Sequence, residues 1–201
     1  MASSLDGKIG PANVDQFVAI GSKHDLQHLI TLRDGADAVF FGANTFRTWP
    51  KPHRGNSPNH HPHHFILSRS LDLDPTSELF QHPEYPLTIF TPSSIVKPFP
   101  DHVRLVEVPA SAETIPFILE KIQSAGVESL LVEGGGLTLS QMIEAKALQE
   151  LYLTVVPKII GQADAPELLG GETFTSKFDL EVLDTQLVGS ETYFHLKFNY
   201  L

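Results

Sequence analysis

The chain has 201 residues, 41% of them hydrophobic and 19% charged, which predicts one globular domain over residues 1–201. Its formal charge of −10 argues against nucleic-acid binding, because a nucleic-acid binder needs a basic face. The absence of cysteine excludes disulfides, thiolate metal sites and a cysteine nucleophile. No apolar run is long enough to span a membrane and the N-terminus is too polar for a secretion signal, so we expect a cytoplasmic protein with no membrane partner.

Hydrophobic periodicity predicts alternating strands and helices along the chain. The first helix opens with a capping-box pattern at Ser22 and Asp25, carries the apolar stripe Leu26, Leu29 and Ile30, and ends at Gly35. A second helix is expected around Pro116 with its end at Gly126, and a third follows a run of three glycines at 134–136. Apolar runs predict strands at 38–41, 64–67, 87–90, 103–106, 129–132, 150–156, 180–188 and 192–199.

The order of these elements predicts the fold class. Helices between apolar strands imply parallel pairing, whereas the last two strands are separated only by Gly189-Ser190, which predicts an antiparallel hairpin. We therefore expect a three-layer α/β fold: a mixed, mostly parallel sheet with a C-terminal antiparallel hairpin, flanked by helices on both faces.

One segment, residues 50–64, is rich in proline and histidine and predicts a long loop. Neighbouring histidines in such a loop rarely converge on one ion, and no carboxylate or thiolate lies nearby in the sequence, so we expect no metal site. A surface loop is the preferred interpretation, and a lid over a substrate is the alternative. The histidines are His53, His60, His61, His63 and His64.

The segment from Val132 to Leu137 contains Glu133 and three glycines between a predicted strand and a predicted helix. Glycines let the backbone turn tightly and approach a ligand, and the free N–H groups at a helix start favour an anion. A phosphate of a nucleotide cofactor is the preferred ligand. A plain strand-to-helix turn is the alternative for this motif alone.

Two further corners follow apolar strands. Gly42, Asn44 and Thr45 open a short helix after the first strand, with an ordinary turn capped by Asn44 or Thr45 as the alternative. Ser68 and Arg69 place a hydroxyl and a guanidinium after the next strand, a pair suited to phosphate oxygens. Ligands bind outside the carboxyl ends of strands in such sheets, so three corners of this kind predict a dinucleotide with an additional ribose phosphate.

The motifs at 2–10, 42–45, 67–69, 133–136 and 157–161 occur in the order found in the dihydrofolate-reductase-like superfamily. More narrowly, the segments 4–9, 132–135 and 157–161 resemble those of the riboflavin-pathway pyrimidine reductases. The resemblance implies a dihydrofolate-reductase-like fold. It also implies an NADPH-dependent reductase that converts a ribosylaminopyrimidinone 5′-phosphate to its ribityl form.

The resemblance also implies how NADPH is held. Ile9 and Gly10 would line the nicotinamide, and the 42–45 corner would hold the pyrophosphate. Ser68 and Arg69 match the position that binds the 2′-phosphate, which implies NADPH rather than NADH. The cofactor residues implied in full are Ile9, Gly10, Gly42, Asn44, Thr45, Ser68, Arg69, Gly134, Gly135, Gly136, Leu137 and Thr138.

On the substrate side, the resemblance implies that Glu133 faces the pyrimidine and accepts hydrogen bonds from its ring N–H groups. Asp6 either positions substrate or caps its own loop. No histidine–carboxylate pair stands out as an acid/base system, so catalysis should rest on orientation and exclusion of water, and no catalytic residue is assigned. The substrate-binding residues implied are Ser4, Asp6, Arg47, Arg54 and Glu133.

The chain departs from this family at two places. Trp49 stands where the family usually has an aspartate, which leaves the exact substrate open. The family also has an apolar strand and a lysine ahead of Ser4, so we expect that the true start lies upstream of Met1. Two alternatives remain: a dihydrofolate or pterin reductase, and a non-catalytic NADPH-binding member of the family. Family members pair through their C-terminal strands, and the last strand, at 192–201, is expected to leave a long apolar edge in a monomer, so a homodimer is expected.

Overall fold

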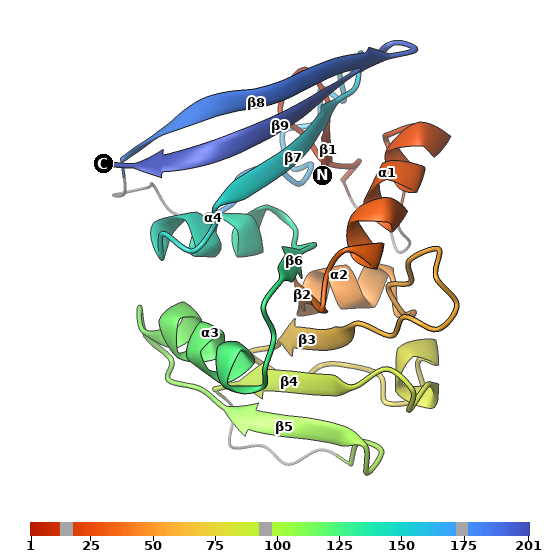
Figure 1. The fold of residues 1–201 in the computed structure, drawn as a ribbon, viewed down its shortest axis with the longest axis vertical. Helices are drawn as coiled ribbons and strands as arrows, with labels where there is room; N and C mark the ends of the chain where they lie inside the picture. The colour runs from red at the N-terminus through yellow and green to blue at the C-terminus, as the bar shows by residue number, and fades with distance from the viewer. Residues whose placement is uncertain (13–17, 93–97, 172–176) are drawn as a thin grey trace. The chain divides into compact units, whose positions relative to one another are not determined.

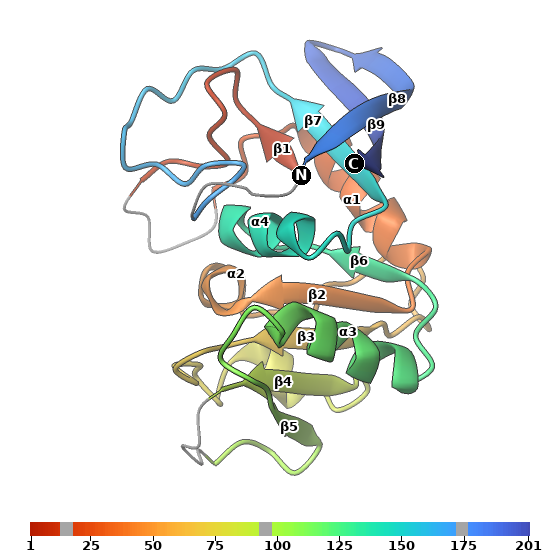
Figure 2. The same cartoon turned by 90° about the vertical axis from the view of Figure 1, so that its left-hand side faces the viewer.

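A computed structural model of the chain describes residues 1–12, 18–92, 98–171 and 177–201. These residues form two compact units: unit 1 contains residues 1–29 and 135–201, and unit 2 contains residues 30–134. Figures 1 and 2 show the ribbon in two views. The single domain over residues 1–201 stays a prediction.

Unit 2 is built on a parallel five-stranded sheet. Its inner strands are short, mostly buried apolar runs, as expected for strands that are covered on both faces, whereas the edge strand at 103–107 is partly exposed. In spatial order they are β5 (Val103–Glu107), β4 (Leu87–Thr91), β3 (His63–Leu67), β2 (Ala38–Gly42) and β6 (Leu130–Val132).

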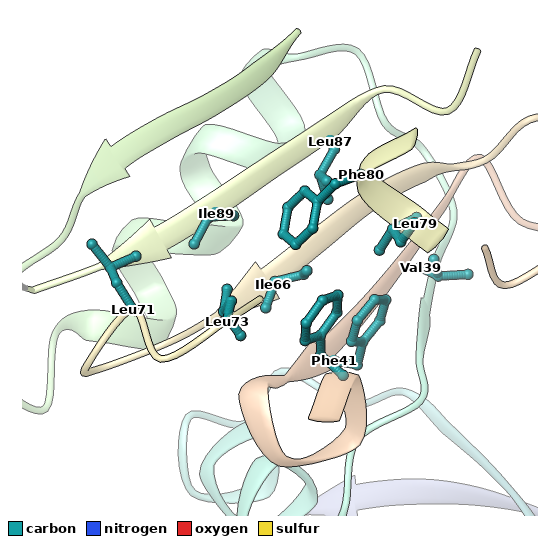
Figure 3. Packing of buried hydrophobic residues seen from close by; sticks show 10 residues of the cluster. Val39, Phe41, Ile66, Leu71, Leu73, Leu79, Phe80, Leu87 and Ile89 are labelled. Carbon is teal, nitrogen blue, oxygen red and sulfur yellow. The ribbon is translucent and has the colours of Figure 1, made fainter. Parts of the chain in front are cut away.

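The two faces of this sheet bury different side chains. On one face, Val39, Phe41, Ile66 and Ile89 pack in a cluster that includes Phe46 of α2 (Ala43–Thr48) and residues of the 3-10 helix η1 (Glu78–Gln81), as Figure 3 shows for the labelled residues. The other face is covered by α3 (Thr114–Ser124), which buries Ile115, Ile118 and Ile122. Helices therefore flank the parallel sheet on both sides, as predicted.

The segment 68–81 contributes to this core although no element was predicted in it. Leu71 and Leu73 are 0% and 3% exposed, and Leu79 and Phe80 of η1 are each 1% exposed. Leu71 adopts φ = 52°, which turns the chain back over the sheet. Acidic residues alternate with these leucines, and the pattern is too short to predict either a helix or a strand.

The histidine-rich segment is only partly a surface loop. His63 and His64 belong to β3, and the two histidines at the ends of the segment, His53 and His64, are 2% and 0% exposed. The prediction of a surface loop is therefore wrong at both ends, because these rings find hydrogen-bond partners inside unit 2.

Unit 1 contains a second sheet. Its strands, in spatial order, are β1 (Ala2–Ser3), β7 (Glu150–Val155), β9 (Glu191–Tyr200) and β8 (Phe178–Val188). The strand β1 pairs with β7 in parallel, and β9 is antiparallel to both β7 and β8. The hairpin β8–β9 turns at residues 189–190, where Gly189 has φ = 64°, a conformation that favours glycine. In the same unit, α4 (Gly136–Glu144) buries Leu139, Met142 and Ile143.

The first helix, α1 (Lys23–Asp34), differs from its prediction in two respects. Ser22 caps it by accepting the N–H of His24, but the N–H of Ser22 donates to Glu191 rather than to Asp25, so the capping box is wrong in its acidic partner. The predicted apolar stripe is also wrong in part, because Leu26 is 51% exposed and the buried side chain of this helix is Arg33.

The predicted fold class is confirmed: parallel strands alternate with helices, and an antiparallel hairpin ends the chain. One detail differs, since the strands form two hydrogen-bonded sheets where one mixed sheet was predicted. Among the helices of the described ranges, none combines the length and the apolar character needed to cross a bilayer.

Candidate functional site

The carboxyl ends of the unit 2 strands bring two predicted corners side by side. All five strands are parallel, so their carboxyl ends share one edge of the sheet. The register pairs Gly42 at the end of β2 with Leu67 at the end of β3. Ser68 and Arg69 therefore follow directly beside the start of α2. Glu133 follows β6 on the other side of β2, and its N–H donates to the carbonyl of Phe40.

Ser68 and Arg69 have free hydrogen-bonding groups. Ser68 is 1% exposed, and within the described part of the chain its Oγ has no hydrogen-bond partner. Arg69 is exposed, and its guanidinium makes no hydrogen bond or ion pair with any residue that the structure describes. An unpaired buried hydroxyl is unfavourable unless a ligand or water satisfies it. This corner is therefore suited to an oxyanion.

The neighbouring corner is organised by its backbone. Gly42 is the N-cap of α2 and provides no side-chain cap, so the alternative of a cap by Asn44 or Thr45 is wrong. Asn44 accepts a hydrogen bond from Arg47, and Arg47 also donates to the carbonyl of Asp72 at 3.0 Å. The guanidinium of Arg47 is thus held on the segment that follows β3.

The glycine segment divides between the two units. Glu133 and Gly134 belong to unit 2, and residues 135–138 belong to unit 1. A Cβ at Gly135 would have no atom of the described residues within 4 Å, whereas a Cβ at Gly136 would lie 2.2 Å from the carbonyl oxygen of Glu167. Within this α4 start, Leu137 is 44% exposed and Thr138 is 6% exposed. Gly136 is required for packing, and Gly135 leaves open space.

In unit 1, Asp6 ties its own loop to residues 160–161. One carboxylate oxygen of Asp6 accepts from the Ser4 hydroxyl at 2.6 Å and from the N–H of Ile160 at 3.1 Å, and the other accepts from the N–H of Gly161 at 2.8 Å. The Ser4 hydroxyl, followed by these backbone N–H groups, lowers the pKa of Asp6 to about 2. Of the two roles considered for Asp6, these contacts support the loop cap.

The same loop is fastened on both sides of Gly7, which adopts φ = 75°. Lys8 forms an ion pair with Glu167 at 2.7 Å, and the N–H of Ile9 donates to the carbonyl of Pro166 at 2.9 Å. The predicted nicotinamide residues Ile9 and Gly10 therefore lie on a loop of fixed conformation within unit 1.

Glu133 is the centre of a buried polar cluster in unit 2. Its two oxygens accept from Nε and Nη2 of Arg33 at 2.7 and 2.6 Å, and His53 Nδ1 lies 2.8 Å from Oε2. The Glu133 side chain is 8% exposed. Burial alone would raise the pKa of Glu133, but the neighbouring His53 and the hydrogen bonds from Arg33 and His53 hold it well below its ordinary value. The carboxylate is therefore ionised and paired.

His64 completes this cluster as a neutral ring. Its Nε2 accepts the N–H of His53 at 2.9 Å, so its Nδ1 carries the proton that is donated to the carbonyl of Pro62 at 2.8 Å. Burial, followed by the neighbouring His53, lowers the pKa of His64 to about 3.

The two arginines predicted to bind a phosphate do not converge. Arg47 stays with the residues that follow β2 and β3, as described above. Arg54 lies with the residues that precede β4: its guanidinium is 5.8 Å from the ring centre of Tyr85, and its Nη2 is 3.3 Å from His82 Nε2. Arg54 is exposed, so its remaining donors can reach a ligand.

Sequence reasoning missed Arg33, His53 and His64. No histidine–carboxylate pair was expected, but the structure brings His53 to Glu133, which lies 80 positions away in the sequence. The local signal for Arg33 is its place as a basic residue in the last turn of α1. Within the described ranges, no group of three or more histidine and acidic side chains has the arrangement of a metal site.

The fold and these strand-end corners define an α/β protein of the dihydrofolate-reductase-like class. The chain belongs to the RibD C-terminal domain family, which matches residues 1–194.

Two relatives illustrate this membership. The riboflavin biosynthesis protein PYRR, chloroplastic, of Arabidopsis thaliana is 29% identical over 177 residues, which cover 84% of this chain and 29% of that protein. The 2,5-diamino-6-ribosylamino-4(3H)-pyrimidinone 5′-phosphate reductase of Archaeoglobus fulgidus is 24% identical over 200 residues, covering 92% of this chain and 90% of that protein. The chain thus spans less than a third of the plant protein and most of the archaeal one.

Solved structures confirm the fold. RibD of Acinetobacter baumannii, form 1, superposes with a TM-score of 0.79 at 19% identity, covering 98% of this chain and 56% of that one. A dihydrofolate reductase of Enterococcus faecalis, complexed with NADP(H), superposes with a TM-score of 0.51 at 15% identity, covering 98% and 93%.

Proposed function

We propose that this chain is an NADPH-dependent oxidoreductase that reduces a ribosylaminopyrimidinone 5′-phosphate to its ribityl form in riboflavin biosynthesis. The observation that carries the proposal is the corner formed by Gly42 and by Ser68 and Arg69. There, donors without a partner among the described residues lie at the carboxyl ends of two paired strands. Family membership and the name of the archaeal relative support the reaction.

Ser68 and Arg69 are the proposed ligands of the cofactor's 2′-phosphate. A buried hydroxyl and an exposed guanidinium, neither of which has a partner in the part of the chain that the structure describes, match phosphate oxygens, and NADH has no phosphate at this position. We assign the pyrophosphate side to the backbone of the 42–45 corner. By resemblance to the family, Gly134 to Thr138 are the further proposed cofactor residues. Ile9 and Gly10 would line the nicotinamide, which supplies the hydride when NADPH is bound.

On the substrate side, Arg54 is the proposed phosphate ligand. Its guanidinium is exposed and pairs with no carboxylate among the described residues, whereas Arg47 is held by Asn44 and Asp72. Glu133 remains the proposed residue beside the pyrimidine, although Arg33 and His53 already occupy its oxygens. Ser4 and Asp6 act in this proposal by shaping the loop in unit 1.

The reaction requires a hydride at C1′ of the ribose: the C1′–O4′ bond breaks, and O4′ takes up a proton from solvent to become a hydroxyl of the open ribityl chain. In this proposal the protein contributes orientation of the sugar carbon and exclusion of water. We also propose a cytoplasmic homodimer that pairs through its C-terminal strands. A long edge strand with exposed apolar side chains supports the dimer.

The test is turnover of the purified chain with NADPH and the ribosylaminopyrimidinone 5′-phosphate, followed by the loss of NADPH absorbance. Parallel reactions contain NADH in place of NADPH, or dihydrofolate in place of the pyrimidine. We expect oxidation of NADPH with the pyrimidine phosphate and little with dihydrofolate. Oxidation with dihydrofolate alone, or NADPH binding without any turnover, would overturn the proposal.

A further inference from the structure

The buried cluster around Glu133 also holds the loop that carries Arg54. We propose that Arg33 and His53 are positioning residues: they fix residues 53–57 on unit 2 so that the Arg54 guanidinium is presented to the substrate phosphate. This inference rests on the proposed function, because it takes Arg54 as the phosphate ligand.

Arg33 links the cluster to Arg54 directly. While Nε and Nη2 of Arg33 bind the Glu133 carboxylate, its Nη1 donates to the backbone carbonyl of Arg54 at 3.3 Å. The Arg33 side chain is 10% exposed. A planar guanidinium can make these bonds together, whereas a lysine ammonium has no fixed fork with which to do so.

His53 is held from three directions. Its Nδ1 contacts Glu133, its backbone N–H donates to His64, and its ring stacks on Phe41 with centroids 4.2 Å apart and planes at 2°. Because residue 53 is fixed by its backbone, its ring edge and its ring face, the adjacent Arg54 backbone has little freedom.

The other end of the loop is fastened by the residue after Arg33. The Asp34 carboxylate accepts the N–H groups of Asn56 and Ser57, both at 3.0 Å. The loop lies so close to this carboxylate that a Cβ at Gly55 would be 2.0 Å from Asp34 Oδ1. Consecutive residues of α1 therefore hold both ends of a loop from which the Arg54 side chain extends over Tyr85.

The chemistry of the cluster supports a role beyond stability. Burying an ion pair requires desolvation of both charges, and apolar residues of similar volume often stabilise a protein as well. His53 Nε2, moreover, is buried without a hydrogen-bond partner in the described part of the chain. Such groups are better explained by a requirement for fixed geometry than by stability alone.

The first experiment uses Arg33→Lys, which keeps the charge but loses the fork. We expect KM for the ribosylaminopyrimidinone 5′-phosphate to rise at least about tenfold, as for the loss of one charge-assisted bond. The Kd of NADPH should change less than about twofold, and KM for the same compound without its phosphate should rise by much less than KM for the phosphorylated compound, because His53 still holds Glu133. Asp37→Asn is the matched control, because Asp37 accepts the N–H groups of Glu128 and Ser129 at the other end of β2.

A double-mutant cycle with Arg54→Ala decides whether Arg33 acts through Arg54. If it does, the double variant has the KM of Arg54→Ala alone. Additive effects, or equal KM increases for the phosphorylated and unphosphorylated compounds, would overturn the inference while the proposed function stands. If the wild-type chain has no turnover, the proposed function fails and the inference fails with it.

A second pair of variants covers the case in which Arg33→Lys does not fold. His53→Asn keeps a donor for Glu133, and we expect it to retain a KM within about threefold of wild type. His53→Leu removes the donor and should raise KM for the phosphorylated compound more than KM for the unphosphorylated one. Equal KM values for these two folded variants would contradict a positioning role for His53.

Discussion

Glu133 combines a full negative charge with almost complete burial. Three hydrogen bonds from Arg33 and His53 replace the water that the carboxylate would otherwise bind. Because the pKa of Glu133 is held well below its ordinary value, the group stays ionised throughout the physiological range. A ligand that approaches Glu133 therefore meets a carboxylate whose orientation is already set.

His64 gives this unit a specific acid sensitivity. Its folded pKa of about 3 lies far below the ordinary value of 6.5, so below pH 6.5 the unfolded chain takes up a proton that the folded chain does not. The contribution is fully present above pH 6.5 and is lost as the pH falls towards 3. For one such histidine, the free energy of unfolding decreases by about 2 kcal/mol between pH 7.5 and pH 5.

We predict that His64→Gln makes this pH dependence weaker. Urea unfolding at pH 7.5 and pH 5 gives the two free energies for each protein. The drop between the two pH values should be smaller in the variant by about 2 kcal/mol. His63, whose pKa is lowered to about 4 by burial and by Arg104, is present in both proteins and cancels. Equal drops would show that His64 does not titrate as described.

Arg69 should decide the choice between the two nicotinamide cofactors. Arg69→Ala is expected to weaken NADPH at least about tenfold, since a charge-assisted hydrogen bond contributes roughly 1.5–3 kcal/mol, and to leave NADH affinity nearly unchanged. Fluorescence titration of both cofactors measures this. Arg104→Ala, at an exposed arginine of β5, controls for the loss of charge. If Arg69→Ala keeps the NADPH preference, the 2′-phosphate lies elsewhere.

Local sequence patterns predicted the strand-end corners but not the buried polar cluster around Glu133. Ser68 and Arg69 follow an apolar strand directly, so their position at its carboxyl end could be read from a few neighbouring residues. Arg33 and Glu133 are 100 positions apart and His53 lies in a proline-rich segment, so no sequence period connects them. Their contacts depend on the tertiary packing of α1 and β6.

Within the glycine segment, one glycine is required for packing and another leaves space on its Cβ side. Gly135 has φ = −68° and ψ = 177°, an extended conformation that any residue adopts, and its Cβ side is open. Gly136 has no such freedom, because its α-carbon faces the backbone of residues 167–170. Position 136 therefore requires glycine for packing.

We predict that Gly136→Ala lowers the free energy of unfolding by about 1–3 kcal/mol, the usual range for overpacking. Its methyl group would meet the Glu167 carbonyl oxygen at 2.2 Å, so backbone must move. Gly135→Ala is the matched control and should change stability by less than about 1 kcal/mol. Denaturant unfolding of both variants measures the difference, and equal stabilities would contradict this assignment.

The elements that could be predicted are those with a strong period or a clear end. Most strands of unit 2 contain a short apolar run, and the hairpin in unit 1 is marked by Gly189. The predicted apolar stripe of α1 is wrong in part because polar contacts of Ser22 and Arg33, rather than leucines, anchor this helix. The 3-10 helix η1 was not predicted because its four residues are too few to show a hydrophobic period.

The predicted edge strand at 192–201 is β9, which pairs with both β7 and β8, so the prediction of an edge there is wrong. At the edge of this sheet, the described part of the chain leaves β8 without a second partner strand. It is an edge strand of 11 residues, and Leu180, Val182 and Leu187 on it are 43%, 58% and 73% exposed. A long apolar edge promotes association unless it is covered. Two-fold pairing is the commonest cover in soluble oligomers.

We predict a homodimer that uses β8. Light scattering at micromolar concentration should report twice the chain mass of 22.2 kDa. The double variant Val182→Lys and Leu187→Lys should report a single chain, because charges on the strand oppose pairing. A wild-type mass of one chain, or an unchanged dimer in the variant, would contradict pairing through this strand.

The central claim is that the chain transfers a hydride from NADPH to the ribose carbon of a pyrimidine phosphate. The most direct measurement uses NADPH deuterated at both C4 positions with the ribosylaminopyrimidinone 5′-phosphate, and reads the product by mass spectrometry and NMR. We predict one deuterium at C1′ of the ribityl chain. Product without deuterium at C1′, or oxidised cofactor with an unchanged sugar, would contradict it.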